Sequence, residues 1–167
     1  MKRTVSYIAA LLCAALALSL LAGCGSLFFG GGGAPEIPKG YVEKSEHMQK
    51  GGWQDYTDYC KYIYADGGIF EKDDAYAALS EPGEKRDEPA EMRALFESFR
   101  AFMAAADRLS EYDFDPECVN AGDLYRYKKT TSQDLPENPL GGGSIDGYSV
   151  WFFDKESATL YYIHANT

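Results

Sequence analysis

The densest set of side chains that could do chemistry is an acidic turn in the final third of the chain. It carries carboxylates at alternate positions, Asp113, Asp115 and Glu117. Oxygen ligands at alternate positions are typical of calcium loops, so these three residues are a candidate calcium site. The EF-hand spacing fails, however, because Pro116 interrupts the loop and the sixth-position glycine and twelfth-position glutamate are missing. We therefore interpret the turn as a helix-to-strand loop with solvated carboxylates.

Carboxylates also suggest hydrolysis. A glycosidase needs two carboxyl groups about 5 to 9.5 Å apart across the sugar bond, and residues two positions apart rarely reach this without help from the fold. A nucleophile elbow is not present either, since the nearest match, residues 142–146, ends in aspartate. An envelope hydrolase stays open as the alternative function, with its carboxylates drawn from Asp113, Asp115, Glu117 and Asp123.

The sequence gives little support for a metal site or a catalytic thiol built from histidine and cysteine. His47 and His164 are the two histidines, and neither has a second histidine at i+4 or a cysteine at metal spacing. Cys118 with His164 would form a thiol–imidazole pair only in a cleft that also holds an orienting group. Cys60 and Cys118 either form a disulfide or are two buried free thiols. We predict no metal and no cofactor, and we favour a non-enzymatic protein although catalysis stays open.

Aromatic residues form the second candidate surface. Residues 148–153 are apolar on both faces of an expected strand. One face covers the long helix, and the other is either covered by the shorter helix that contains Trp53 or left as a binding patch. Such a patch would stack on sugars or pack against a partner protein. The candidate binding residues are Trp151, Phe153, Tyr161 and Tyr125.

The N-terminal residue pattern predicts an export signal. Lys2 and Arg3 precede an uncharged apolar run from Ile8 to Leu21, which is shorter than the roughly 20 residues that span a bilayer. The run ends in Leu21-Ala22-Gly23-Cys24. This ending resembles the lipobox of bacterial prolipoproteins, and the resemblance covers residues 1–24. It implies a covalent diacylglyceryl lipid on Cys24 and cleavage of the bond before it. Two acyl chains would hold the protein firmly on the membrane surface.

The resemblance, the glycine and proline composition and the chain length together divide the chain into three parts. Residues 1–23 are the signal peptide, residues 24–40 read as a flexible glycine- and proline-rich tether, and residues 41–167 form a single globular domain. Two basic residues leave with the signal, so 14 basic residues face 26 acidic ones and the mature chain has a formal charge of −12. Such a surface repels nucleic acid, which we exclude as a partner.

Apolar periodicity predicts the elements that must position these residues. Helical spacing predicts three helices, at residues 53–64, 73–79 and 89–109. Alternation predicts three strands, at residues 124–128, 148–153 and 159–164. Residues 130–147 are expected to form a long, mobile connection. The expected fold is α+β, with two or three helices followed by a three-stranded antiparallel meander packed on the long helix.

These patterns together predict a bacterial lipoprotein anchored on the extracytoplasmic face of the cell membrane. Its expected partners are the membrane, through the lipid, and an envelope protein or glycan. The binding surface would be the aromatic strands or the loop of residues 130–147.

Overall fold

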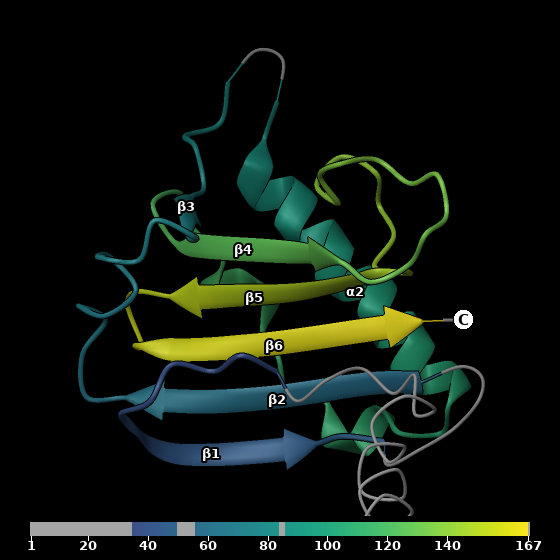
Figure 1. Ribbon diagram of the computed structural model, residues 1–167, viewed down its shortest axis with the longest axis horizontal. Helices are drawn as coiled ribbons and strands as arrows, with labels where there is room; N and C mark the ends of the chain where they lie inside the picture. Colours follow the sequence, from purple (N-terminus) through teal and green to yellow (C-terminus); the bar gives the residue numbers. More distant parts are fainter. Residues whose placement is uncertain (1–34, 50–55, 84–85, 167) are drawn as a thin grey trace, which may run out of the picture. The chain divides into compact units, whose positions relative to one another are not determined.

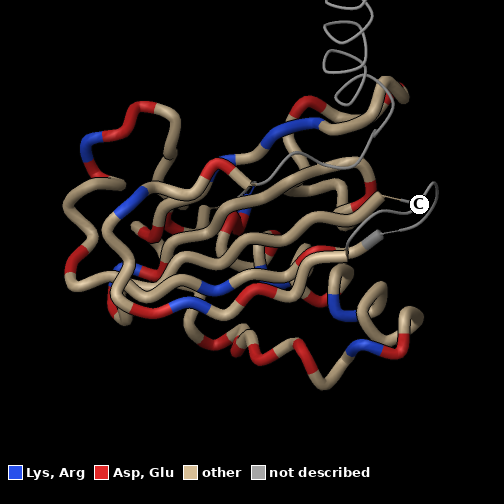
Figure 2. Tube along the Cα trace, turned by 60° about the horizontal axis from the view of Figure 1, so that its bottom comes forward, with Lys and Arg blue, Asp and Glu red and all other residues tan. Residues whose placement is uncertain are grey.

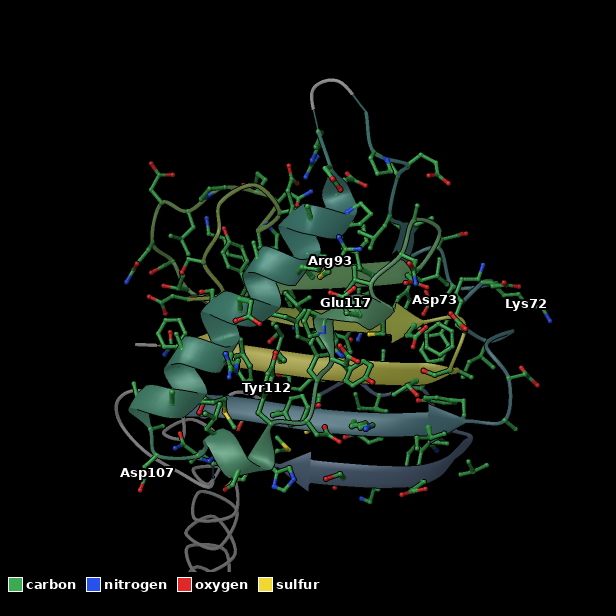
Figure 3. All side chains as sticks on the ribbon, turned by 180° about the vertical axis from the view of Figure 1, so that it is seen from behind. Lys72, Asp73, Arg93, Asp107, Tyr112 and Glu117 are labelled. Atoms are coloured by element: carbon green, nitrogen blue, oxygen red, sulfur yellow. The ribbon has the colours of Figure 1, made fainter. Side chains whose placement is uncertain are left out.

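The computed structural model describes residues 35–49, 56–83 and 86–166. These residues form one six-stranded sheet in which all neighbours are antiparallel, in the order β1-β2-β6-β5-β4-β3 (Figure 1). The strands are β1 (Tyr41–His47), β2 (Tyr56–Tyr64), β3 (Ala77–Ala78), β4 (Leu124–Lys129), β5 (Tyr148–Asp154) and β6 (Thr159–Asn166). Among these residues, one α-helix, α2 (Glu88–Ala105), crosses one face of the sheet (Figure 3). Two 3-10 turns follow it, η2 (Leu109–Glu111) and η3 (Pro116–Cys118).

The expected fold class is wrong. The described chain is mostly β, with one α-helix and six strands in place of two or three helices and a three-stranded meander. Strands β1 and β2 precede the helix and extend the sheet beyond β6. The β2–β6 ladder runs from Tyr56↔Asn166 to Ile63↔Thr159, so segments from the two ends of the domain are neighbours. Such a long-range pairing leaves no local signal in the sequence.

The helix expected at residues 53–64 is instead strand β2. Its side chains alternate between the two faces, with Tyr59 in the core beneath the helix and Cys60 in the core on the opposite side. Because both faces carry buried apolar residues, the polar–apolar alternation that marks a half-exposed strand is hidden, and the remaining spacing imitates a helix. Tyrosine and β-branched residues such as Thr57 and Ile63 favour the strand.

The short helix expected at residues 73–79 is also wrong. Asp73 does cap a turn, because its Oδ1 accepts the N–H of Ala75 at 3.0 Å, but the chain then enters β3. β3 pairs with β4 through Ala77↔Tyr125 and Ala78↔Leu124. A helix of seven residues is marginal without tertiary packing, and pairing at the sheet edge replaces it.

The long helix is confirmed, although it ends four residues early. The Oδ1 atom of Asp87 accepts the N–H of Ala90 at 3.0 Å and caps the start, and Pro89 lies in the first turn. Beyond Ala105, Asp107 adopts a φ of 56°, a left-handed conformation that redirects the chain into η2. The apolar stripe faces the sheet, and its fully buried residues are Met92, Leu95, Phe96, Phe99 and Met103. No helix in the described ranges has the length and apolar character needed to cross a membrane.

The three C-terminal strands are confirmed as β4, β5 and β6, and a tight turn after Asp154 joins the last two. Asp154 Oδ1 accepts the N–H of Glu156 at 2.9 Å within this turn. The connection of residues 130–147 is packed against the domain. Ile145 is fully buried in it, and Lys129 Nζ donates to the carbonyl of Leu135 at 3.0 Å.

The sheet separates two apolar cores. On the helix face, α2 covers a cluster that includes Tyr59, Val150, Phe152 and Ile163. On the other face, a second cluster contains Cys60, Tyr62, Phe70, Trp151, Phe153, Leu160 and Tyr162. We call this second side the strap face, after the strap of residues 35–38 that lies against it. Figure 2 shows Asp and Glu residues spread over loops and strand ends, with Lys and Arg interspersed.

Candidate functional site

The four aromatic residues predicted to form a binding surface are all buried. Trp151 is 4% exposed, Phe153 is 0% exposed, and Tyr161 and Tyr125 are each 6% exposed. They are also divided between the two faces, since Trp151 and Phe153 lie on the strap face and the two tyrosines on the helix face. They therefore do not form one exposed stacking surface. Cys24 and Trp53 lie outside the described residues.

The carboxylates of the acidic turn have separate structural roles. Asp113 accepts a hydrogen bond from Tyr59 Oη at 2.6 Å and pairs with Lys61 Nζ at 2.7 Å. Burial opposes the ionisation of Asp113, but the bonds from Lys61 and Tyr59 prevail and lower its pKa. Asp115 caps η3 by accepting the N–H of Glu117 at 3.0 Å, and Glu117 itself is exposed.

Asp123 is buried and bound to the backbone. Its Oδ2 accepts the N–H of Asn120 at 2.7 Å and its Oδ1 accepts that of Lys155 at 3.0 Å. Burial raises the pKa of Asp123. The carboxylate hydrolase gains no support from this arrangement, since Asp113, Asp115 and Asp123 each hold part of the fold through the bonds described above, and Glu117 is exposed. In the part of the chain that the structure describes, no group of three or more His, Cys, Asp or Glu side chains is placed to hold a metal ion.

Cys60 and Cys118 are free thiols on opposite sides of the sheet. Cys60 lies in the core of the strap face, whereas Cys118 packs against the core of the helix face, so the disulfide left open by the sequence does not form. The thiol–imidazole pair is excluded for the same reason, because His164 shares the face of Tyr162 and lies beside Asp58. Burial raises the pKa of both thiols to about 12, which leaves them protonated near neutral pH.

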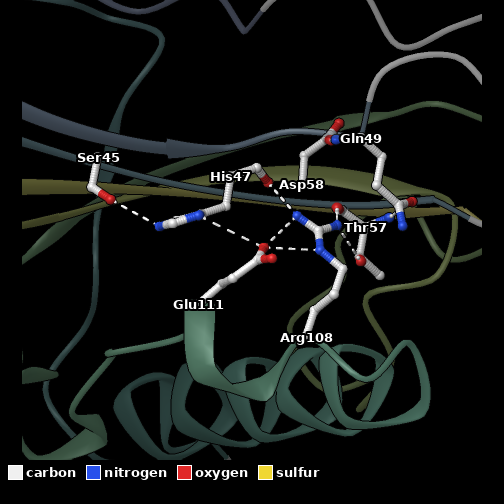
Figure 4. Close-up of polar contacts among 7 residues, drawn as sticks. All are labelled: Ser45, His47, Gln49, Thr57, Asp58, Arg108 and Glu111. Atoms are coloured by element: carbon white, nitrogen blue, oxygen red, sulfur yellow. Dashed lines mark hydrogen bonds and ion pairs between the residues drawn. The ribbon is translucent and has the colours of Figure 1, made fainter.

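A polar cluster centred on Arg108 ties the ends of β1 and β2 to the turn after α2 (Figure 4). Arg108 Nη2 donates to the carbonyl of His47 at 2.9 Å, and Nη1 donates to the carbonyl of Thr57 at 2.5 Å. The same guanidinium pairs with Glu111 Oε2, at 2.6 Å from Nη2 and 2.9 Å from Nε. The hydrogen bond from Arg108 lowers the pKa of Glu111. Arg108 thus connects the turn after α2 to two strand ends that lie more than 50 residues earlier in the chain.

Ser45, His47 and Glu111 lie in the order of a hydrolytic triad. Ser45 Oγ is 2.9 Å from His47 Nε2, and His47 Nδ1 is 3.7 Å from Glu111 Oε2 (Figure 4). The second distance is too long for a hydrogen bond. Moreover, Arg108 already neutralises the carboxylate, which therefore does little to orient His47 or strengthen it as a base. We interpret the group as a surface network that stabilises the strand ends.

A second polar row crosses the strap face at the far end of the sheet. Asp58 and Ser149 are the cross-strand neighbours of His164 on its two sides, and Asp58 Oδ2 lies 3.5 Å from His164 Nδ1. Ser149 Oγ lies 3.2 Å from Tyr162 Oη. Asp58, His164 and Ser149 are each 5% exposed or less. Because burial separates this row from any substrate, we interpret it as an internal network.

The strap, residues 35–38, lies against the aromatic cluster of the strap face although the sequence predicts it as part of the tether. Arg126 Nη2 donates to the carbonyl of Glu36 at 2.8 Å, and Tyr64 Oη donates to the carbonyl of Pro38 at 2.7 Å. Between these two bonds, Ile37 packs against the apolar cluster. The strap is therefore held by its main chain and by one apolar side chain.

Arg126 is the polar centre of the strap face. Its guanidinium carbon lies 4.1 Å from the ring centre of Trp151 and 5.4 Å from that of Tyr76. Within the described residues, Arg126 Nε, Trp151 Nε1 and Tyr76 Oη are buried without a hydrogen-bond partner. Buried groups of this kind normally find partners. We call Arg126, Trp151 and Tyr76 the Arg126 group. The strap binds this group but leaves part of its hydrogen-bonding capacity unused.

Sequence patterns single out Trp151 but miss the rest of this site. The sequence did contain a signal for Arg126. This residue lies between Tyr125 and Tyr127 in a strand, so its side chain is on the face opposite to the two tyrosines. Pro35 and Pro38 likewise mark an extended segment rather than a fully flexible one. The contact between the strap and Arg126 of β4 cannot be predicted from the sequence pattern of either segment.

Comparison with protein-family models, with curated proteins and with solved structures finds no match for this chain. Its function therefore has to be inferred from its own sites.

Proposed function

We propose that this protein is a lipoprotein, anchored through Cys24 on the extracytoplasmic face of the membrane, that binds an extended, proline-containing segment of an envelope protein. The strap is the observation that supports the binding role. Residues 35–38 of the same chain occupy the strap face through main-chain carbonyls, as a bound peptide would. The lipobox supports the anchor, and binding rather than catalysis is the role we assign to the domain.

The strap contacts favour a polypeptide ligand. The carbonyls of Glu36 and Pro38 accept the two hydrogen bonds, and every extended peptide offers carbonyls at this spacing. Pro35 and Pro38 also have the Pro-x-x-Pro spacing of ligands that dock in aromatic-lined grooves. Proline-rich segments are already extended before they bind and so lose little conformational entropy.

A glycan fits this site less well. Sugar rings stack on exposed aromatic faces, whereas the guanidinium of Arg126, which belongs to the sheet and not to the strap, lies over the ring of Trp151. The exposed stacking surface on which the glycan hypothesis depended is thus not available at Trp151. An extended peptide needs no free ring face, since it bonds to the edges and polar tips of the same residues.

The unused donors favour exchange of the strap for a better ligand. A buried donor without an acceptor costs about 1–3 kcal/mol, so a peptide that also offers acceptors to Trp151 Nε1 and Tyr76 Oη would bind more tightly than residues 35–38. Because the strap belongs to the same chain, it competes at an effective concentration in roughly the millimolar range. Peptides without the additional bonds would therefore fail to displace it.

Selection from a random peptide library tests this function. The bait is the mature chain with Cys24→Ser, which removes the lipid, and Ile37→Asp, which weakens the strap by placing a charge in the apolar cluster. The matched control adds Arg126→Ala and so removes the donor to the peptide carbonyl. We expect peptides with two prolines three positions apart to be enriched on the first bait and not on the second.

Calorimetry with a peptide of residues 34–39 measures the same interaction directly. The peptide should bind the Ile37→Asp chain, and replacement of both prolines by alanine should weaken binding by about tenfold or more. The proposal fails if the library yields no enrichment, or if the enriched peptides lack proline and bind the Arg126→Ala control equally well.

A further inference from the structure

Strand β1 is an exposed edge of the sheet. One side of β1 pairs with β2 from Tyr41↔Tyr64 to His47↔Tyr59, and the other side pairs with no described residue. Six of its seven residues are exposed. The opposite edge, β3, is two residues long, so β1 is the longer free edge within the described chain. An edge of this length is a ready template for a further strand.

The charges on β1 restrict which strand can be added. Glu43, Lys44 and Glu46 are the kind of residues that protect an edge against indiscriminate pairing. They alternate in sign along the strand, and Lys44 Nζ already lies 2.7 Å from Glu46 Oε2 on the same face. A partner strand must therefore place opposite charges against them, which limits both its sequence and its register.

A second copy of β1 meets this requirement in one register. In an antiparallel pair related by a two-fold axis, each face of the sheet stays continuous only when the axis lies midway between the two copies of one residue, so that this residue faces itself. Axes at Glu43, Lys44 or Glu46 set like charges directly against each other. The axis at Ser45 instead places Lys44 against Glu46 of the second copy, and Glu43 against His47 of that copy, and it repeats both pairs by symmetry.

We propose that two copies of this chain associate through β1 in the Ser45-centred antiparallel register, which joins their sheets into one. On the strap side of the joined sheet, two lysines and two glutamates form a four-charge cluster. On the helix side, each Glu43 lies against a histidine. Ser45 faces its own copy across the axis and adds no charge. This association involves neither the strap nor the Arg126 group, so its test is independent of the proposed peptide binding.

Cysteine cross-linking of the full lipidated protein in intact cells tests the register. Residues directly opposite on antiparallel strands have Cβ atoms about 4.5–5.5 Å apart, close to the disulfide range of roughly 3.5–4.5 Å. Ser45→Cys should therefore give a disulfide-linked dimer on a non-reducing gel under mild oxidation. The control is Val42→Cys, whose residue is 69% exposed. Its two copies would lie about 20 Å apart, so it should cross-link at least about fivefold less.

Charge reversal in the Ser45→Cys background tests the pairing. Lys44→Glu replaces two attractive pairs with two repulsive ones and should raise the dimer dissociation constant about tenfold or more, seen as a loss of cross-linked product. Adding Glu46→Lys restores the opposite charges and should restore the product, which also shows that the chain still folds. Equal cross-linking at Val42 and Ser45, no product at Ser45, or no recovery in the double reversal would each overturn the proposal.

Discussion

The guanidinium carbon of Arg126 lies 4.1 Å from the ring centre of Trp151, its direct cross-strand partner. The same guanidinium donates to the carbonyl of Glu36, which is 90 residues earlier in the chain. Arg126 therefore joins the aromatic surface of the sheet to the strap. This one side chain lies over the ring of Trp151 and holds the strap in a defined path.

Arg126→Ala should release the strap. It removes a charge-assisted hydrogen bond and the stacking on Trp151, and we expect a loss of about 1–3 kcal/mol in unfolding free energy. Lys39 follows the strap directly, so trypsin should cleave there faster in the variant than in the wild type. Arg100→Ala, at an exposed position on α2, is the control. Unchanged cleavage after Lys39 would show that Arg126 does not hold the strap.

Arg108→Ala should destabilise the domain more than most substitutions at its surface. The change leaves the carbonyls of His47 and Thr57 without their donor and Glu111 without its partner. We expect urea denaturation to show a loss of about 2–4 kcal/mol, because the Arg108 side chain is 14% exposed and its bonds are largely shielded from water. Arg100→Ala should change the unfolding free energy by less than about 0.5 kcal/mol. Equal effects of the two substitutions would contradict this role.

Glu111 should make stability sensitive to acid. Arg108 lowers the pKa of Glu111 in the folded chain, so the folded state binds this proton less readily than the unfolded state does. The stabilising contribution is complete above the ordinary glutamate pKa of about 4.3 and is lost as the pH falls through the lower pKa of the folded state. The stability difference between wild type and Glu111→Gln should therefore shrink from about pH 6 to about pH 3. A difference that stays constant over this interval would rule out the linkage.

Both thiols of the domain should remain reduced and unreactive in the folded protein. Burial raises the pKa of Cys60 and Cys118 to about 12, so their reaction with a disulfide reagent should be at least about a hundredfold slower than that of a free thiol. Unfolding in denaturant should restore rapid reaction of both. Mass spectrometry that finds an intramolecular disulfide would contradict the separation of the two cysteines by the sheet.

Cys24→Ala should abolish membrane anchoring if the lipobox functions as its resemblance implies. Labelling with a fatty acid such as palmitate should mark the wild type and not the variant, because the thiol that carries the lipid is absent. Cys13→Ala is the matched control, since that residue lies inside the signal and should leave the label unchanged. An unmodified N-terminus on the wild-type protein would refute the assignment.

Elements with their own local pattern could be predicted from the sequence. The stripe of α2 and the alternation of β4, β5 and β6 are each complete within a single segment, and all four elements form near the expected positions. β2 was mistaken for a helix because both of its faces are apolar. β1 carries no periodic signal, since it is an exposed edge that exists through its pairing with β2.

The candidate sites likewise divide into features that the local sequence predicts and features that depend on the tertiary structure. Residue types alone identified Trp151 and the acidic turn as sites of interest. The small number and the spacing of the histidines and cysteines also argued against a metal site or a catalytic thiol. Whether Trp151 is exposed, which side chains neighbour Arg126, and which face each cysteine occupies were decided by the tertiary structure. The reason is physical: periodicity records which side of its own segment a residue faces, whereas burial and pairing depend on a second segment brought there by folding. For Trp151 that segment is β4, whose Arg126 lies over its ring and in turn binds the strap, and no pattern around the tryptophan encodes either contact.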